Sequence, residues 1–213
     1  MSANRQVISF EGMDGSSKKT QSLLTLDAMR ASSNQPWEYV DFPAYNDEYY
    51  GYLVDHVLSK PLPDSPSLAE AYQRSLSFII NRMAFFKKHT IPDNVNIIAN
   101  RYYTSNILYQ TAHLSDADKI AYYNFAEKIE TEIGGVPKAT KIFALRVNPK
   151  LSIQNMINRG ATLDNYETLE TQERIYDNIQ FFADNFGWII VECSDDKKMY
   201  DRQEINKQFL QHM

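Results

Sequence analysis

One stretch near the N-terminus decides the fold, residues 6–22 with the sequence QVISFEGMDGSSKKTQS. Its β-branched and aromatic start, Val7–Phe10, predicts a buried strand. A Gly- and Ser-rich turn follows, and two lysines then open an amphipathic helix. This layout is typical of a P-loop, in which backbone N–H groups and a lysine surround a polyphosphate. We therefore predict a nucleotide phosphate site at residues 11–20.

The loop departs from the usual pattern, Gly-x-x-x-x-Gly-Lys-Ser/Thr, at two positions. Gly12 and Lys18 fit, but Ser17 replaces the second glycine and Lys19 replaces the hydroxyl residue. The missing hydroxyl removes the usual P-loop ligand for Mg²⁺. Thr20 is one residue late and points roughly 100° away on a helix. We expect that other groups hold the metal ion, or that the positive charge of Lys19 partly replaces the charge of the metal ion.

Length and composition limit the class of protein. The 213 residues are enough for one α/β domain, which we expect to span residues 1–213. The net charge of −5 predicts no general attraction to nucleic acid or anionic membranes. The single cysteine, Cys193, excludes an intrachain disulfide and a Cys-rich zinc site. The polar N-terminus predicts no signal peptide, and no apolar run approaches the roughly 20 residues of a membrane span, so we expect a cytoplasmic protein.

Strand and helix patterns alternate along the chain. A capping box from Ser67 to Glu70 starts the longest helix. The alternation predicts an open five-stranded parallel sheet with helices on both sides. Together with the loop at residues 11–20, it predicts a three-layer α/β/α P-loop NTPase fold. The expected strands are Val7–Phe10, Trp37–Phe42, Val95–Ala99, Lys141–Val147 and Trp188–Cys193, and the expected helices are Lys18–Met29, Leu68–Lys88, 116–132, 149–158, 168–184 and 199–211. Ligands of such sheets bind beyond the carboxyl ends of the strands, which directs attention to residues 11–19, 43–45 and 100–106.

Several side chains in or near these segments suggest chemistry. Arg101 follows a buried strand, where its fork could grip a phosphate or pair with a helix carboxylate. Phe78 and Arg82 share a helix face and could stack on a base and bond its edge, although the pair taken alone favours a core phenylalanine and a surface arginine. Residues 159–167 suit either a lid or a solvated loop. Arg146 either faces a donor base or pairs with a helix acid.

Taken in order, these pieces resemble the thymidylate kinase family of P-loop nucleoside monophosphate kinases. The resemblance spans residues 6 to about 194. The matching segments are FEGMDG at 10–15, KKTQ at 18–21, FPAY at 42–45, Phe78 with Asn81-Arg82, NRY at 100–102, SN at 105–106, GVPK at 135–138, and RG at 159–160 with DNYE at 164–167.

The resemblance implies a role for each matching residue. Phe78 would stack on thymine, Arg82 would face the base edge, and Asn106 would contact the base. Arg101 and Tyr45 would contact the monophosphate, and Tyr109 would lie under the deoxyribose. Four sets follow: ATP binding by Gly12, Met13, Asp14, Gly15, Ser16, Ser17, Lys18, Lys19 and Thr20; catalysis by Asp14, Lys18, Arg101 and Arg159; substrate binding by Phe42, Tyr45, Phe78, Arg82, Arg101, Asn106, Tyr109 and Tyr166; and Mg²⁺ binding by Asp14 and Glu167. A lid at about 158–168 and a homodimer packed through the Phe78–Phe86 helix are also implied.

The departures from the family pattern fall on the donor side. The family's Asp-Arg-Tyr is here Asn100-Arg101-Tyr102, and the lid has one arginine, Arg159, where relatives often have several. We expect transfer of the ATP γ-phosphoryl group to dTMP, giving dTDP and ADP. A nucleotide-binding pseudokinase with a recognition or assembly role is the alternative, and a different or modified deoxynucleotide is a third possibility. The sequence leaves open whether Ser17, Lys19 and Asn100 permit full activity.

Overall fold

A five-stranded parallel sheet forms the centre of the computed structural model, which describes residues 5–47, 49–60, 66–158, 160 and 167–213. The strand order is β2-β3-β1-β4-β5, and every recorded pair is parallel. The predicted fold class is therefore confirmed. The strands are β1 Val7–Gly12, β2 Trp37–Asp41, β3 Asn96–Asn100, β4 Lys141–Arg146 and β5 Ile189–Glu192.

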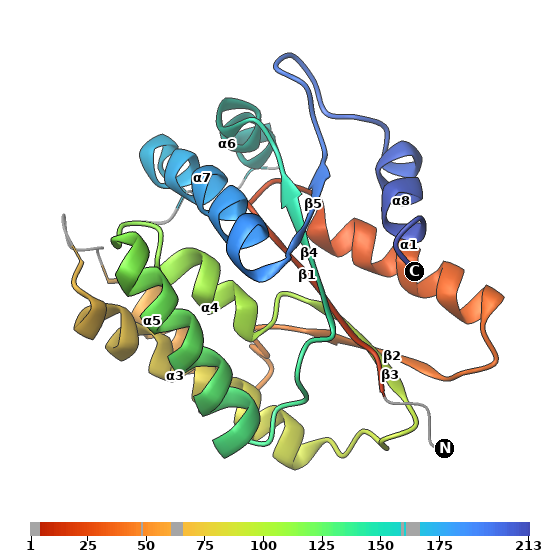
Figure 1. The fold of residues 1–213 in the computed structure, drawn as a ribbon, viewed down its shortest axis with the longest axis horizontal. Coiled ribbons are helices and arrows are strands. Elements are labelled where there is room, and N and C mark those ends of the chain that lie inside the picture. The colour runs from red at the N-terminus through yellow and green to blue at the C-terminus, as the bar shows by residue number, and fades with distance from the viewer. Residues whose placement is uncertain (1–4, 48, 61–65, 159, 161–166) are drawn as a thin grey trace.

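Helices cover both faces of the sheet (Figure 1). They are α1 Lys18–Ser32, α2 Tyr50–Leu58, α3 Leu68–Lys88, α4 Tyr103–Gln110, α5 Asp116–Glu127, α6 Pro149–Asn158, α7 Leu169–Phe186 and α8 Arg202–Leu210. A π-helical turn, η1 Lys128–Ile133, continues α5. Helices α1 and α8 pack together on one face, while α3, α4, α5 and α7 cover the other.

The burial of β1 explains why the sheet needs both helical layers. All six of its residues are buried. Val7 packs into one hydrophobic cluster with Ile179 of α7, and Ile8 packs into the other with Phe209 of α8. Successive side chains on a strand point to opposite faces, so a continuous apolar run needs cover on both sides.

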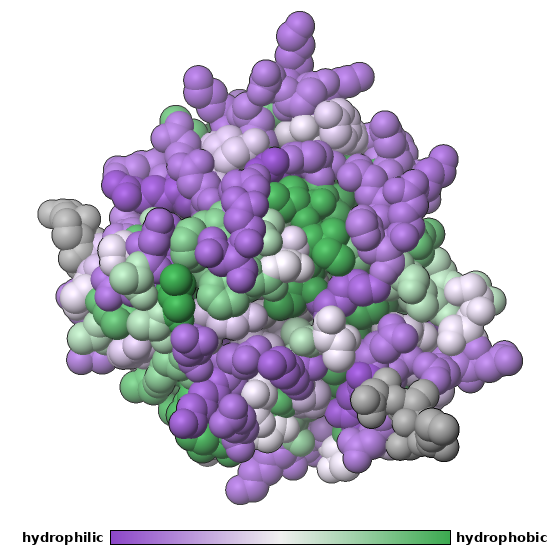
Figure 2. Space-filling model, in the orientation of Figure 1, coloured by the Kyte–Doolittle hydropathy of each residue, from purple (hydrophilic) through white to green (hydrophobic). Residues whose placement is uncertain are grey.

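The surface is mostly polar in the orientation of Figure 1. Figure 2 shows hydrophobic side chains gathered between α7 and α8, over β5, where the edge strand is only partly covered. Within the described ranges, none of the helices combines the length and the hydrophobicity that crossing a membrane requires.

The predicted elements match the observed ones within a few residues, except that we did not predict α2 and α4. The capping box of α3 is present, with the Ser67 hydroxyl accepting from the Glu70 amide and the Glu70 carboxylate accepting from the Ser67 amide. Helix α4 starts directly after the turn that follows β3, within polar residues that we treated only as a strand end. It is this short helix that carries Asn106 and Tyr109 to the site.

The sheet places the functional segments at one edge. Phe10 of β1 and Asp41 of β2 both pair in register with Asn100 of β3, so these three strands end side by side. The P-loop follows β1, Arg101 follows β3, and a cis Phe42–Pro43 bond follows β2.

Candidate active site

The turn after β1 needs glycine at two positions. Gly12 has φ 132°, and a Cβ there would lie 2.2 Å from the carbonyl oxygen of Leu145 on β4. Gly15 has φ 74°, and its Cβ would lie 2.7 Å from the carbonyl oxygen of Ser152 on α6. Side chains other than hydrogen do not fit either space, and both backbone conformations favour glycine. The neighbouring strand and helix therefore determine the tight shape of the loop.

Ser17 adopts the left-handed conformation that suits a glycine, with φ 66° and ψ 24°. The loop shape is thus kept despite the serine, at an energetic cost of about 1–2 kcal/mol. Ser17 is also the N-cap of α1, and its side chain makes no capping bond. The amide N–H groups of Ser17, Lys18 and Lys19 donate to nothing in the described part of the chain. Such unpaired amides at a helix N-terminus form an anion-binding site.

Lys18 is held against the inside of the loop. Its Nζ donates to the carbonyl oxygens of Gly12 at 3.0 Å and Met13 at 2.6 Å, and lies 3.6 Å from a carboxylate oxygen of Asp14. Burial, together with the charge of Arg101, lowers the pKa of Lys18 to about 8, although Asp14 opposes this shift. A phosphate at the loop would favour the charged form of the lysine and raise this pKa.

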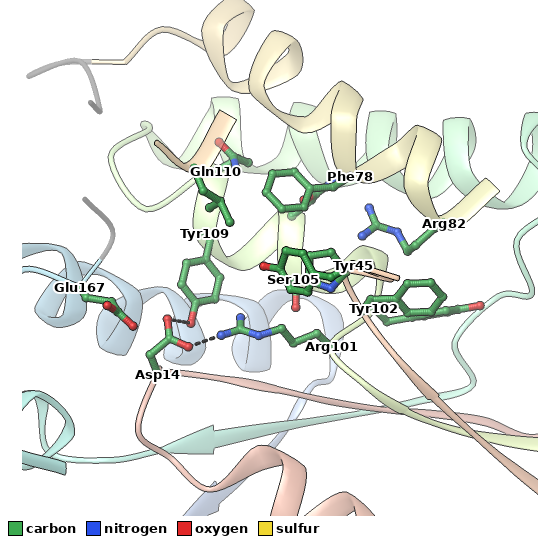
Figure 3. Close-up of a pocket in the computed structure, with 14 residues that line it drawn as sticks. Asp14, Tyr45, Phe78, Arg82, Arg101, Tyr102, Ser105, Tyr109, Gln110 and Glu167 are labelled. Carbon is green, nitrogen blue, oxygen red and sulfur yellow. Dashed lines mark hydrogen bonds and ion pairs between the residues drawn. The ribbon is translucent and has the colours of Figure 1, made fainter. Parts of the chain in front are cut away.

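Asp14 links the loop to two residues from elsewhere in the chain (Figure 3). Arg101 donates to Asp14 through Nη2, and the Tyr109 hydroxyl lies 2.9 Å from the other carboxylate oxygen and 3.0 Å from the carbonyl of Gly12. Burial alone would raise the pKa of Asp14, but Arg101 and Lys18 outweigh it and lower the pKa. Arg101 has φ 58°, an unfavourable conformation that directs its side chain to this cluster.

A cavity of about 230 Å³ opens beside this cluster. Phe42 lies buried at its wall and packs against the rings of Phe85, edge-on, and Tyr102, tilted, whereas Tyr45 is half exposed. The Asn106 amide donates to the carbonyl of Ser75 at 3.5 Å. The sequence-predicted residues that line this cavity are Asp14, Phe42, Tyr45, Phe78, Arg82, Arg101, Asn106, Tyr109 and Glu167.

The other predicted residues lie elsewhere. Of the P-loop residues, only Asp14 lines this cavity; Gly12, Met13, Gly15, Ser16, Ser17, Lys18, Lys19 and Thr20 form the adjoining loop and helix start. Arg159 and Tyr166, like most of the proposed lid, lie outside the described residues.

Arg82 is buried rather than exposed, so the surface-arginine interpretation is wrong. Only 2% of its side chain is accessible, and none of its partner Glu130 is. Its Nε lies 3.0 and 3.1 Å from the two carboxylate oxygens, and Nη2 donates to the same carboxylate. Burial raises the pKa of Glu130, and Arg82 opposes the rise. We missed Glu130, because one glutamate in an amphipathic helix gives no sign of a partner 48 residues away.

Two departures from the family pattern, Lys19 and Asn100, meet at one carboxylate that we also missed, Asp41. Lys19 pairs with one Asp41 oxygen at 2.9 Å, and the Asn100 amide donates to the other at 2.7 Å. Asp41 and Asn100 are register partners in β2 and β3. The hydrogen bond from Lys19 to Asp41 raises the pKa of Lys19. A carboxylate is therefore still present at this edge, on the neighbouring strand.

The oxygen ligands suit a magnesium ion only in part. No cluster of three or more metal-binding side chains is found in the residues that the structure describes. Asp14 and Glu167 nevertheless line one cavity, and Asp41 lies beside the loop. Mg²⁺ is commonly held by one or two carboxylates together with substrate phosphates and water. The residues therefore fit a metal ion that arrives with a nucleotide.

Buried and partly buried polar residues support the loop. The Glu11 carboxylate is fully buried and accepts hydrogen bonds from Thr104, at 2.5 Å, and from Ser105. Burial raises the pKa of Glu11. Ser152 of α6 donates to the carbonyl of Asp14, and Asn155 donates to that of Gly15 at 3.4 Å. The sequence around Ser152 and Asn155 contains no motif, so only the fold reveals these two residues.

Arg146 pairs with an acid, but on a strand rather than a helix. Its Nε donates to Glu192 of β5 at 2.8 Å, and Nη1 donates to Gln180 of α7 at 2.8 Å. The guanidinium lies 4.9 Å from the ring centre of Tyr176. These contacts account for an arginine at the end of β4.

Known proteins with similar sequence and structure agree on one family. The family model described as thymidylate kinase matches residues 10–203. The thymidylate kinase of Plasmodium falciparum is 28% identical over 189 residues, which cover 88% of this chain and 81% of that protein. A probable thymidylate kinase of Methanococcus aeolicus is 27% identical over 213 residues, covering 97% and 94%.

A solved structure supports the fold. The thymidylate kinase of Candida albicans superimposes with a TM-score of 0.69 at 19% identity, covering 100% of this chain and 92% of that one. The loop, its cluster of charged residues and the adjoining cavity therefore occur on a fold that this enzyme shares. Because the family model matches nearly the whole chain, the protein belongs to the thymidylate kinase family.

Proposed function

We propose that this protein is a thymidylate kinase, which transfers the γ-phosphoryl group of ATP to dTMP and forms ADP and dTDP. The observation that carries the proposal is that the P-loop and the aromatic cavity meet at Asp14 and Arg101. A donor bound at the loop and an acceptor bound in the cavity would therefore have their phosphates side by side. Family membership supports both substrates.

The loop provides the donor site. Three backbone amides would hold the β- and γ-phosphates, those of Ser17, Lys18 and Lys19. The turn around the phosphates would be completed by Met13, Gly15, Ser16 and Thr20. The Nζ of Lys18 already lies at the inner side of the loop, because Gly12 and Met13 accept its hydrogen bonds. Phosphoryl transfer depends mainly on positioning and on neutralising charge, and these groups supply both.

The cavity provides the acceptor site. Phe78 would stack on the base, with Asn106 and Arg82 near its edge and Phe42 as a wall. Tyr109, whose hydroxyl is fixed near Asp14, would lie under the sugar. Arg101 and Tyr45 would bind the monophosphate, and Tyr166 of the lid would bind the substrate as well. Arg101 would also stabilise the transferred group, as would Arg159 of the lid.

Magnesium with ATP, a homodimer and a cytoplasmic location complete the proposal. Asp14 and Glu167 would meet the metal ion, whose charge would offset that of the phosphates. Leu76 and Ile80 leave 48% and 41% of their surface exposed on one face of α3, which supports packing against a second copy.

A coupled assay of ADP release tests the proposal. With ATP, Mg²⁺ and dTMP, we expect turnover that falls at least a hundredfold in Lys18→Ala, because the lysine is the central cation of the loop. A wild-type rate no higher than that of Lys18→Ala contradicts the proposal. If dTMP then still binds in calorimetry while ATP does not, the protein is a binding protein rather than a kinase.

A further inference from the structure

The buried pair of Arg82 and Glu130 leaves one edge of the guanidinium unused. Glu130 accepts from Nε and Nη2, both on the same edge of the fork. No hydrogen bond from Nη1 is recorded within the described ranges, although an arginine side chain carries five N–H donors. Three N–H groups therefore remain, two on Nη1 and one on Nη2, on a side chain that is 2% accessible.

The unused donors belong to a residue of the acceptor cavity. Arg82 lines this cavity together with Phe78, which lies one helical turn earlier on α3. Figure 3 shows the guanidinium beside the Phe78 ring, whereas the Asp14–Arg101 pair lies on the opposite side of the cavity. Arg82 therefore faces the end of the acceptor site that is remote from the P-loop, where the base would lie.

The charge of Arg82 is already balanced there. Its bidentate partner, Glu130, contributes one negative charge at hydrogen-bond distance, so the pair offers little net attraction to a phosphate dianion. The remaining N–H groups belong to a side chain that lines the cavity and need an acceptor there, since a donor that a ligand covers without pairing is destabilising. A neutral carbonyl oxygen meets this need, whereas an amino group would bring a donor against a donor.

Glu130 fixes the direction of those donors. An arginine side chain has several rotatable bonds, and bidentate pairing with a carboxylate fixes the plane of its fork. Glu130 lies in the π-helical turn η1, within which Ile133 is 65% exposed while Glu130 is fully buried. The Val136 amide donates to the Glu130 carbonyl at 2.9 Å and fastens the end of this turn. Short π-helical turns frequently occur at functional sites.

We propose that Glu130 is a positioning residue for base selection. It orients the free edge of Arg82 so that its N–H groups donate to a pyrimidine that carries a carbonyl group there and disfavour a pyrimidine that carries an amino group. The inference rests on the proposed function, because it assumes a pyrimidine monophosphate in the cavity. It makes Glu130, which touches no substrate, a determinant of the preference for dTMP and dUMP over dCMP.

Glu130→Asp is the decisive variant. It keeps the charge that a buried arginine requires, but withdraws the carboxylate by one bond, about 1.5 Å. For each of dTMP, dUMP and dCMP, kcat and KM are measured in the coupled assay, and Kd by calorimetry. We expect a KM for dTMP at least tenfold higher and a dTMP-to-dCMP ratio of kcat/KM at least tenfold smaller. A loss of folded protein alone would lower both rates equally and leave the ratio unchanged.

Two further variants complete the test. Arg82→Lys keeps a cation opposite Glu130, but its side chain has a single nitrogen and cannot both pair with Glu130 and offer N–H groups from a second edge to the base. We expect the dTMP-to-dCMP ratio of kcat/KM to fall as it does in Glu130→Asp. Glu192→Gln breaks the Arg146–Glu192 pair, which lies outside the cavity, and we expect it to keep the wild-type ratio. Should Glu130→Asp fail to fold, Arg82→Lys alone decides the outcome.

A ratio within twofold of wild type in either cavity variant overturns the inference, even if kcat falls. Failure of the proposed function is a separate result, in which the wild type phosphorylates none of the three monophosphates. In that case the dissociation constants decide the inference: the wild type must bind dTMP more tightly than dCMP, and Glu130→Asp must reduce this difference.

Discussion

Lys18 is the residue whose charge most directly controls the donor site. Its pKa of about 8 results from burial and from the neighbouring charge of Arg101, while its hydrogen bonds to Gly12 and Met13 hold it in the loop. A pKa this low for a lysine means that part of the population is neutral in mildly alkaline solution. The affinity for a polyphosphate must then depend on pH.

We predict that ATP binding takes up protons between about pH 8 and pH 9. A bound phosphate favours the charged lysine and raises its pKa, so binding protonates the neutral fraction. With a starting pKa of about 8, more than half a proton should be taken up at pH 8.5. The affinity should be constant below about pH 7 and should weaken as the pH rises through 8.

Calorimetry at pH 8.5 in two buffers with different ionisation enthalpies measures this uptake. The control is a variant in which Lys18 is replaced by methionine, for which the uptake should disappear. Equal apparent enthalpies in the two buffers for the wild type contradict the prediction.

Ser17 provides a stability prediction at the same scale. Its left-handed backbone is unfavourable for serine, and its side chain makes no capping bond that a substitution would lose. Ser17→Gly should therefore raise the free energy of unfolding by about 1 kcal/mol, after allowing for the greater entropy of unfolded glycine. In a protein of this size, that corresponds to a melting temperature about 2–4 °C higher. Thermal denaturation that shows no change or a decrease contradicts the account of this loop.

At the scale of elements, helix α6 shapes the P-loop although it contains no recognised motif. It approaches Gly15 so closely that a Cβ would lie 2.7 Å from the Ser152 carbonyl, and it also donates hydrogen bonds to the carbonyls of Asp14 and Gly15. The loop is thus held between β1 and α6. A displacement of α6 should disturb phosphate binding.

We predict that Gly15→Ala weakens ATP binding at least tenfold and destabilises the fold by more than about 2 kcal/mol, since it adds a steric clash to an unfavourable φ. Gly187→Ala is the matched control. Gly187 has a similar φ, 68°, but nothing lies within 4 Å of its Cβ position, so only the backbone cost of about 1 kcal/mol applies. Chemical denaturation and ATP titration of both variants measure the difference. Equal effects of the two substitutions would show that α6 does not constrain the loop.

The paired strand ends of β2 and β3 explain why the altered motif can still work. Asp41 keeps a carboxylate beside Asn100, and Lys19 adds a cation that this carboxylate holds. We therefore predict that the double variant Lys19→Thr/Asn100→Asp, which restores the common residue types at these two positions, raises kcat by less than about tenfold. Steady-state rates at saturating ATP and dTMP measure this gain. A hundredfold gain would instead mean that the native loop is catalytically impaired.

The sequence predicts an element well when the interactions that form it join residues close together in the chain, and poorly when they join distant residues. Buried strands such as Val7–Phe10 are recognisable because their apolar run is local, and so is the capping box of α3. Helix α4 was missed because a strand, a strained Arg101 and a polar helix start follow one another within a few residues.

The same distinction between local and distant interactions decides which residues of the site could be predicted. Residues at strand ends, such as Asp14 and Arg101, could be predicted to converge, because parallel strands end at one edge. Glu130 and Asp41 could not, because their partners are distant in sequence and are chosen by the packing of η1 and by the register of β2. The structure does not describe Arg159 and Tyr166, so their roles remain predictions.

For the molecule as a whole, the strand order accounts for the position of the site. β1 lies at the centre of the sheet, between β3 and β4, so the P-loop emerges among segments from both halves of the chain. β3 places Arg101 on one side of the loop, and β4 supplies the backbone that packs on Gly12. The central claim is that two adjoining sites, for a polyphosphate and for a nucleoside monophosphate, meet there.

Calorimetric titration of dTMP into protein saturated with Mg²⁺ and a non-hydrolysable ATP analogue tests that claim most directly. We predict binding of one dTMP per chain while the analogue stays bound. Phe78→Ala should lose about fivefold to 150-fold in dTMP affinity but keep the analogue, because stacking on one ring contributes about 1–3 kcal/mol. Displacement of the analogue by dTMP, or failure of dTMP to bind, would contradict the account.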